Sequence, residues 1–470
     1  MGIDIIDLKP EMNMKSKLYF FFFSSVILLI GCKPDIDNSG AIAKIAFIYL
    51  TEETNAVTKV WTRTLGGSGT TATGTAITSD SSGNYFSTGY TSGTFDGNAI
   101  TGTTDLFLVK YDSDGNKQWT TLLGVSNAST FSTGIAIDVS GNAYITGYTS
   151  GSLDGQTITG DRDLFLVKYN SDGTKQWTKL LGVASVSTYS TGIGMDSSGN
   201  SYVTGYTEGN LDGQTLTGSR DLFLVKYNSD GTKQWTKLQG ASSALTNGSG
   251  ANVDTNGNIF VTGYTNGSLG SQSLTGTIDS FIVKYDSSGS LQWTKLLGVS
   301  GSPTYGFKIS SDSNSNSYIH GCSTSNIDGN TSTTSQGNFM AKYDTNGDKQ
   351  WVKMTGTYYQ TNTACFESVP SLGDIVSDSN GNIYTTDSTG VSIDGQSLTG
   401  SKDAYILKYN SSGSKQGNAT LLGASNASET YSYGIHYDTN NTISIVGYTS
   451  GNLDGNTLIG TKDFFIAKFK

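Results

Sequence analysis

The six tryptophans of this 470-residue chain stand 58 residues apart, and this spacing limits the fold more than any other feature. They are Trp61, Trp119, Trp177, Trp235, Trp293 and Trp351. A rare residue at one fixed interval indicates a repeat protein, in which each repeat is one supersecondary unit and neighbouring units stack to bury a shared core. The fold is therefore set by what one repeat contains.

Each repeat contains four short segments with strand character. Residues 192–206 form two β-prone runs around a Ser-Ser-Gly-Asn turn, which predicts a hairpin because Gly and Asn tolerate positive φ. Residues 221–227 are almost continuously apolar, as expected for a strand covered on both faces. Residues 233–238 carry the tryptophan. Each kind of segment occurs seven times along the chain, with Gly417 at the seventh tryptophan position.

Seven units of four strands predict an all-β fold, a seven-bladed β-propeller over residues 59–470. A propeller manages its exposed sheet edges by closing into a ring. The first element is a lone tryptophan strand, Lys59 to Leu65, and the last unit stops after its third strand. We therefore expect the N-terminal strand to complete the last blade and close the ring. The tryptophans are expected to dock neighbouring blades together.

The repeat also has a recognisable motif. The pattern D-x-x-G-N-x-Y-x-T-G-Y-T, followed by D-x-F-L-V-K-Y and a turn to Trp, resembles the bacterial SBBP β-propeller repeat family. In one unit the match is carried by Asp196, Gly199, Asn200, Tyr202, Thr204, Gly205, Asp221, Phe223 and Lys226. The resemblance extends over roughly residues 59–470 and implies a bladed propeller on an exported protein. The family has no agreed catalytic residues, so the resemblance assigns none to this chain.

The N-terminal segment has the features of an export signal. Lys15 and Lys17 precede an apolar run over residues 18–30, which is too short to span a bilayer but suits a signal-peptide core. The run ends in Leu-Ile-Gly-Cys32, which resembles a bacterial lipobox and implies a lipid on Cys32. Residues 1–31 are thus predicted as a signal peptide, with Met14 as an alternative start, and residues 32–58 as a tether. We expect a protein anchored in the bacterial envelope, at the outer membrane or surface rather than the inner membrane. Ordinary secretion is the alternative.

Composition and motifs argue against several classes of function. The formal charge of −10 does not suit nucleic-acid binding, which needs a basic face. His320 and His436 lie in different repeats without partners at metal-ligand spacing. The chain shows no nucleophile elbow, phosphate-binding glycine loop or zinc motif. We therefore expect that the protein is not an enzyme and has no catalytic residues, no cofactor and no metal. We also expect it to be a monomer.

Two further features are open to more than one interpretation. The recurring aspartates at the turns are expected to accept hydrogen bonds from nearby backbone amides. The stretch Asp112 to Asn116 is similar to a calcium loop but lacks the distal glutamate of an EF-hand. Cys322 and Cys365 lie in neighbouring repeats, and either a disulfide or two separate thiols fits an exported protein.

The ligand surface is expected on the face that carries the longer loops, because loops on a rigid scaffold usually hold the binding residues. Shortly before the innermost strand, one repeat position is aromatic in four units, namely Phe131, Tyr189, Tyr305 and Tyr431. These rings predict an aromatic collar, which Tyr358 and Tyr359 extend from a loop that breaks the period. Aromatic rings stack on sugars or hold apolar side chains; packing of each ring on its own blade is the alternative. The sequence thus predicts a binding or adhesion module for a protein or glycan, with an envelope enzyme acting on glycans or peptidoglycan as the alternative.

Overall fold

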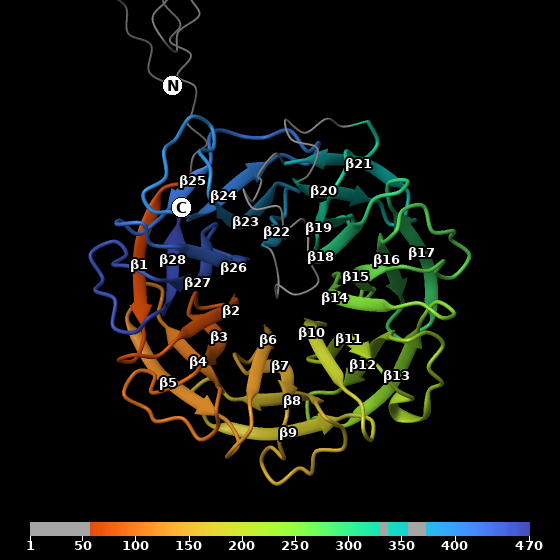
Figure 1. Cartoon of the computed structure of the whole chain (residues 1–470), viewed down its shortest axis with the longest axis horizontal. Coiled ribbons are helices and arrows are strands. Elements are labelled where there is room, and N and C mark those ends of the chain that lie inside the picture. The colour runs from red at the N-terminus through yellow and green to blue at the C-terminus, as the bar shows by residue number, and fades with distance from the viewer. Residues whose placement is uncertain (1–56, 330–336, 356–372) are drawn as a thin grey trace, which may run out of the picture. The chain divides into compact units, whose positions relative to one another are not determined.

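The computed structural model describes residues 57–329, 337–355 and 373–470. In these residues 28 strands form seven four-stranded antiparallel sheets. The sheets are arranged as blades around a central axis, with one strand of each blade innermost (Figure 1). This confirms the predicted seven-bladed, all-β propeller.

Six blades are each built from four consecutive strands, numbered outward from the axis. Blades 1 to 3 are β2 (Ala72–Ser79), β3 (Tyr85–Thr91), β4 (Asp105–Tyr111) and β5 (Lys117–Leu123); β6 (Thr130–Ile137), β7 (Ala143–Thr149), β8 (Asp163–Tyr169) and β9 (Lys175–Leu181); and β10 (Thr188–Met195), β11 (Ser201–Thr207), β12 (Asp221–Tyr227) and β13 (Lys233–Gln239). Blades 4 to 6 are β14 (Thr246–Val253), β15 (Ile259–Thr265), β16 (Asp279–Tyr285) and β17 (Leu291–Leu297); β18 (Thr304–Ser311), β19 (Ser317–Ser323), β20 (Gly337–Tyr343) and β21 (Lys349–Met354); and β22 (Asp374–Ser377), β23 (Ile383–Thr389), β24 (Asp403–Tyr409) and β25 (Thr420–Leu422).

Blade 7 combines the two ends of the ring. It contains β26 (Thr430–Tyr437), β27 (Ile443–Thr449) and β28 (Asp463–Phe469), and its outermost strand is β1 (Lys59–Leu65). β1 pairs antiparallel with β28, with Thr62 opposite Ala467 and Leu65 opposite Phe464. The predicted closure of the ring by the N-terminal strand is therefore confirmed.

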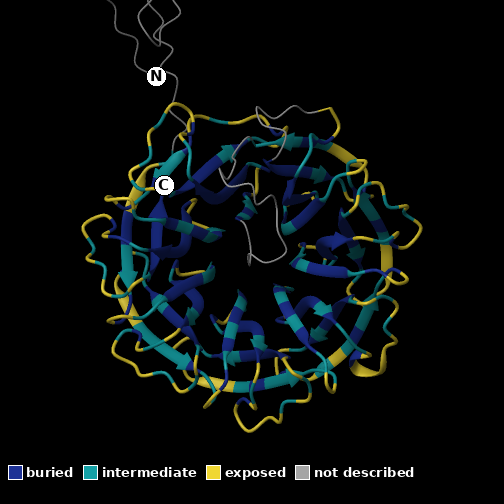
Figure 2. Cartoon of the chain, viewed as in Figure 1, coloured by how far each residue is buried: buried dark blue, intermediate teal, exposed yellow. Residues whose placement is uncertain are grey.

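The burial of the strands follows their position in a blade. In β8 and β12 every residue except the lysine near the end is buried, as expected for strands covered on both faces. Exposed residues gather in the loops around the ring (Figure 2). Gly147 in β7 shows why glycine recurs in the second strand: a Cβ there would lie 1.9 Å from the carbonyl oxygen of Phe131 and 2.8 Å from the Phe165 ring.

The tryptophans dock each blade onto the next, as predicted. Trp177 in β9 lies against Gly231, in the turn between the third and fourth strands of blade 3, where a Cβ would come within 3.0 Å of the indole ring. Gly231 also has a positive φ of 80°, which favours glycine over any residue with a side chain.

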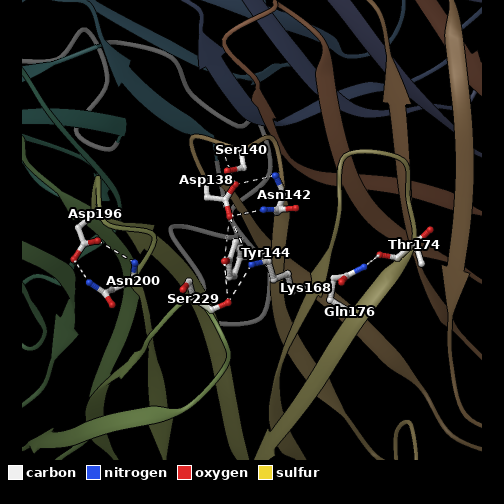
Figure 3. Close-up of polar contacts among 10 residues, drawn as sticks. All are labelled: Asp138, Ser140, Asn142, Tyr144, Lys168, Thr174, Gln176, Asp196, Asn200 and Ser229. Atoms are coloured by element: carbon white, nitrogen blue, oxygen red, sulfur yellow. Dashed lines mark hydrogen bonds and ion pairs between the residues drawn. The ribbon is translucent and has the colours of Figure 1, made fainter.

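A lysine and a tyrosine strengthen the same joint. Lys168 of blade 2 donates to the carbonyl oxygen of Ser229 at 3.0 Å, and the Tyr144 hydroxyl donates to that oxygen at 3.4 Å (Figure 3). The Lys168 ammonium also lies 3.7 Å from the carboxylate of Asp138. The face with the tight turns is therefore occupied by contacts between blades.

Candidate ligand-binding collar

The recurring aspartates of the turns have structural partners. Asp196 accepts hydrogen bonds from the backbone amides of Ser198 at 3.0 Å and Asn200 at 2.9 Å, and from the Asn200 side chain at 2.8 Å. Burial acts to raise the pKa of Asp196, but these hydrogen bonds and one from Tyr202 outweigh it and lower the pKa overall. The prediction that these carboxylates cap turns is confirmed.

Two other groups of aspartates also accept hydrogen bonds from backbone amides. One group begins the third strands, and the other lies in the turn that is similar to a calcium loop. Asp163 accepts from the amides of Thr159 at 2.8 Å and Gly160 at 2.9 Å, which fixes the end of the long loop before β8. Asp112 accepts from the amides of Asp114 at 3.0 Å and Asn116 at 2.8 Å. Among the described residues no group of three or more His, Cys, Asp or Glu side chains is arranged to hold a metal.

The four predicted collar residues occupy one structural position. Phe131, Tyr189, Tyr305 and Tyr431 are each the second residue of an innermost strand, so they lie inside the strand rather than before it. Each is paired with a residue of the adjoining second strand, namely Tyr148, Tyr206, Cys322 and Tyr448 in the same order. The position is at the long-loop end of the strand. Tyr358 and Tyr359 lie outside the described residues.

The collar rings contact one another within blades and across them. The Tyr90 ring of blade 1 lies 5.0 Å from that of Phe131, and the Tyr148 ring lies 4.9 Å from that of Tyr189 in the next blade. Within blades, Phe131 and Tyr148 are 5.3 Å apart, and Tyr189 and Tyr206 are 5.0 Å apart. Aromatic rings therefore follow one another without a break from blade 1 to blade 3, in a geometry typical of edge-to-face and tilted pairs.

The exposure of the rings differs around the collar. Phe131, Tyr189 and Tyr431 are half-buried, whereas Tyr305 is only 6% exposed. Tyr305 lies 5.0 Å from Tyr264, itself 8% exposed, and both belong to an apolar cluster with Cys322. Tyr305 thus packs on its surroundings, and three of the four rings keep an exposed part. The role of all four in binding stays a prediction.

Four basic side chains lie over collar rings. The Arg162 guanidinium lies 5.6 Å from the Tyr189 ring centre and donates to its hydroxyl at 2.9 Å. The Lys402 ammonium lies 4.8 Å from the Tyr431 ring centre. The other two pairs are Arg220 with Tyr206 at 5.2 Å and Lys462 with Tyr448 at 4.1 Å. A cation over the face of an aromatic ring is attracted by the ring quadrupole.

These four cations are not among the residues predicted from the sequence. Each directly precedes the aspartate that begins a third strand, a place where Thr104 and Ile278 stand in other blades. Arg162 and Tyr189 belong to different blades, and the parallel bridge between Arg162 and Ser187 brings them together. A basic residue next to the repeated aspartate was the available signal.

The basic residues differ in their own charge partners. Arg220 forms an ion pair with Glu208 at 3.1 Å, and Lys402 with Glu429 at 3.4 Å. Burial acts to lower the pKa of Lys402, but the Tyr431 hydroxyl and the Glu429 carboxylate outweigh it and raise the pKa. Arg162 and Lys462 form no ion pair with any residue that the structure describes.

Burial lowers the pKa of both histidines, and one of the three cysteines lies in the described residues, beside the collar residue Tyr305. His320 in β19 is buried, and burial lowers its pKa to about 4. His436 in β26 has its pKa lowered to about 4 by the same cause, and its Nε2 lies 2.9 Å from the Ser79 hydroxyl. Cys322 is in a disulfide bond. Cys32 and Cys365 fall outside the described residues. Within the described residues, no helix is long and apolar enough to cross a membrane.

Comparison with known families identifies the repeat. The model of the SBBP β-propeller repeat matches residues 118–154, 176–212, 234–270 and 292–328. The chain carries SBBP repeats. Each match begins in the outermost strand of one blade and ends after the second strand of the next, so one SBBP repeat spans a joint between blades. The resemblance stated from the sequence is confirmed, whereas lipid attachment at Cys32 stays a prediction.

Two curated proteins are similar over part of their length. One is an uncharacterised WD repeat-containing protein of Acanthamoeba polyphaga mimivirus, 28% identical over 288 residues, which are 45% of this chain and 20% of that protein. The other is the regulatory protein FlaEY of Caulobacter vibrioides, 27% identical over 360 residues, which are 67% of this chain and 36% of that protein. The chain thus spans a minor part of both relatives.

Solved structures with a similar fold include enzymes. An ulvan lyase has a TM-score of 0.45 at 12% identity, covering 86% of this chain and 95% of its own. A second polysaccharide lyase has a TM-score of 0.46 at 11% identity, covering 84% and 90%. The propeller domain of the Trilobed protease from Pyrococcus furiosus has a TM-score of 0.42 at 9% identity, covering 84% and 93%. These likenesses concern the fold alone.

The prediction that the chain is not an enzyme is wrong, because proteins of similar fold include polysaccharide lyases. It relied on the lack of a contiguous catalytic motif. In a propeller, side chains from loops of different blades meet only in the folded ring, so a catalytic group need not leave such a motif. The chain is a β-propeller repeat protein.

Proposed function

We propose that this propeller is a binding module that holds its ligand on the long-loop face, at the aromatic collar. A binding face of this kind serves an adhesin and an enzyme alike. The observation that carries the proposal is the unbroken contact of rings from Tyr90 to Tyr206, together with the partial exposure of Phe131 and Tyr189. Rings buried only to stabilise a blade have no reason to keep an exposed part beside a neighbouring ring.

The face with the tight turns is less suited to bind a ligand, which supports the same assignment. There the tight turns are occupied by contacts between blades, such as Trp177 against Gly231 and Lys168 on the Ser229 carbonyl. A ligand on that face would compete with the contacts that hold the ring together. The long-loop face has side chains that change from blade to blade, which suits recognition.

The collar is tested with a double substitution that keeps the blades packed. Phe131→Leu with Tyr189→Leu retains apolar volume against the second strand but removes both rings. We expect the wild-type full chain to bind a defined subset of a printed glycan and peptide array, and the double variant to lose at least about tenfold in affinity, since each ring contributes about 1 kcal/mol beyond its buried area.

The control is Leu291→Ala, which changes an exposed apolar residue at the start of an outer strand and should leave array binding unchanged. An unchanged melting temperature of the double variant shows that the ring is intact. Equal array binding by the wild type and the folded double variant, or no binding by the wild type, contradicts the proposal.

We further propose that the module is displayed on the bacterial envelope by a lipid on Cys32, on the strength of the lipobox-like Leu-Ile-Gly-Cys sequence. Two or more acyl chains are needed for stable anchoring, because one chain holds only weakly. Cys32→Ala is expected to move the protein from the detergent phase to the aqueous phase on phase partitioning. Partitioning that does not change with this substitution refutes the anchor.

A further inference from the structure

We propose that one arc of the collar, from the joint between blades 6 and 7 through blades 7, 1 and 2 to blade 3, selects an acidic glycan, an oligosaccharide that carries carboxylate or sulfate groups. This rests on the proposed function and names the ligand class for the same site. We define the acidic-glycan arc as the rings of Tyr431, Tyr448, Tyr90, Phe131, Tyr148, Tyr189 and Tyr206 with the cations of Lys402, Lys462, Arg162 and Arg220.

Cations in this arc stand out against an acidic chain. The whole protein has a formal charge of −10, yet basic side chains lie over collar rings in blades 7 and 3 and at the joints beside them. Glu208 and Glu429 neutralise Arg220 and Lys402. Arg162 and Lys462 are left without a carboxylate partner among the described residues, and both have an exposed part. Such cations form charge-assisted hydrogen bonds with carboxylate or sulfate groups.

The neighbouring surface offers hydroxyl groups. Thr71 Oγ1 and Ser92 Oγ lie 2.9 Å apart on the loops of blade 1, and Thr103 Oγ1 and Ser129 Oγ lie 2.8 Å apart at the next joint, with exposure at both pairs. The exposed large apolar side chains among the described residues are Val60, Val139, Leu291 and Ile459, and none belongs to the arc. Rings, hydroxyls and cations without an exposed aliphatic anchor suit a charged sugar better than a peptide, whose binding depends on buried apolar or aromatic anchors.

The rest of the collar lacks this combination. Ile278 takes the place of the basic residue before β16 and packs against the cluster of Tyr264, Tyr305 and Cys322. Both tyrosines of that cluster are less than 9% exposed. The collar is therefore charged on one side, where every ring of the arc except Tyr448 is half-buried, and it is apolar and closed in blades 4 and 5. A ligand with regularly spaced negative charges fits the first side alone.

The experiment measures binding of the full chain to three purified oligosaccharides of equal length by titration calorimetry. One carries carboxylates (oligogalacturonate), one carries sulfates (a dextran sulfate fragment) and one is neutral (a dextran fragment). The test variant is Arg162→Gln with Lys462→Gln, which removes the two cations without a carboxylate partner. The matched control is Lys179→Gln with Lys237→Gln, which removes the same charge from the outer strands β9 and β13.

We expect at least one acidic oligosaccharide to bind, with affinity reduced at least about tenfold in the Arg162/Lys462 variant and less than about twofold in the control, since hydrogen bonds to charged groups contribute about 1.5–3 kcal/mol each. The relative affinities for carboxylate and sulfate then show which group is preferred. Binding of the neutral oligosaccharide as tightly as the acidic ones, or an equal loss in the control variant, overturns the inference.

A fourth titration uses an oligoglutamate peptide. It distinguishes recognition of negative charge alone from recognition of a negatively charged sugar. Tighter binding of the peptide than of both acidic oligosaccharides overturns the glycan class while leaving the binding proposal intact. If the Phe131/Tyr189 variant loses binding of any ligand that the Arg162/Lys462 variant still holds, the collar binds but does not select for acid. Different results would therefore refute the binding of a ligand at the collar and the selection of an acidic glycan by the arc.

Discussion

Six of the seven joints between blades are built alike, and the seventh is built differently. In the six, a tryptophan of one blade lies against a turn glycine of the next, so that a Cβ on the glycine would come within about 3 Å of the indole ring. The pairs are Trp61 with Gly115, Trp119 with Gly173, Trp177 with Gly231, Trp235 with Gly289, Trp293 with Gly347, and Trp351 with Gly413. A lysine of the third strand donates to a carbonyl in the same turn, and these lysines are Lys110, Lys168, Lys226, Lys284, Lys342 and Lys468.

The seventh joint, between blades 6 and 7, has no such turn to receive a tryptophan. The third and fourth strands of blade 7 are β28 and β1, which are separated by the whole ring rather than joined by a turn. Gly417 stands at the tryptophan position of blade 6, and the outer strand there, β25, is reduced to three residues. In place of the usual contacts, the Thr420 hydroxyl donates to the Val57 carbonyl at 3.1 Å, and Val57 packs on the core of blades 6 and 7.

The difference indicates what the tryptophans do. The residue is present at every joint where a turn receives it and absent at the joint where none does. Its role is therefore docking. Residues that repeat in every blade build the ring, so recognition is to be sought at positions that change between blades, as the collar cations do.

Removal of β1 should have the largest effect, because it opens blade 7 and breaks the joint between blades 7 and 1 at once. Without residues 59–65, β28 becomes an unpaired edge and Trp61 no longer reaches blade 1. We expect a loss of more than about 5 kcal/mol in the free energy of unfolding, with loss of the cooperative transition in calorimetry.

A synthetic peptide of residues 57–66, added in trans, is the control for this deletion and should restore part of the transition. A deleted protein that melts at the wild-type temperature would show that ring closure does not depend on β1.

Substitution of a tryptophan in a regular joint should have a smaller effect. Trp235→Ala removes a half-buried ring from the joint between blades 3 and 4, and we expect the free energy of unfolding to fall by about 2 kcal/mol. Chemical denaturation measures the fall. Gln234→Ala, at an exposed neighbouring position, should change stability by less than about 0.5 kcal/mol.

The same variant also tests the separation of roles. Trp235→Ala should leave binding at the collar unchanged, since the joint lies at the opposite end of the strands. A loss of ligand affinity in the folded Trp235→Ala protein would show that the two faces are coupled.

The sequence was enough to predict the ring and part of the collar. The number of blades, the closure by Lys59–Leu65 and the docking of the tryptophans all follow from one repeat counted around the chain. The aromatic position was also visible, because it recurs at the repeat interval. The burial of Tyr305 was not visible in the sequence, because Tyr264 and Cys322 cover this residue only in the folded protein.

The cations of the collar could not be predicted in the same way. Arg162 reaches Tyr189 of the next blade, and this contact exists only when the third strand of one blade adjoins the first strand of the next. The basic residue beside the repeated aspartate is visible in the sequence, but the ring that it reaches is not, and Thr104 and Ile278 occupy the same place in other blades. Sequence periodicity thus locates what all blades share, and a ligand contact that differs between blades requires the folded ring.

Addition of the missing tryptophan should have the smallest effect and gives the sharpest test of the docking role. Gly417 has a positive φ of 69°, so any side chain there costs about 1 kcal/mol. Because blade 7 has no turn glycine to receive an indole ring, Gly417→Trp should be no more stable than Gly417→Ala, which carries the same backbone cost without the ring. Thermal unfolding of the two variants beside the wild type measures this. If Gly417→Trp melts at a higher temperature than the wild type, the new indole ring has found a packing partner in blade 7. That result would refute the proposal that a docking tryptophan needs a turn glycine in the next blade.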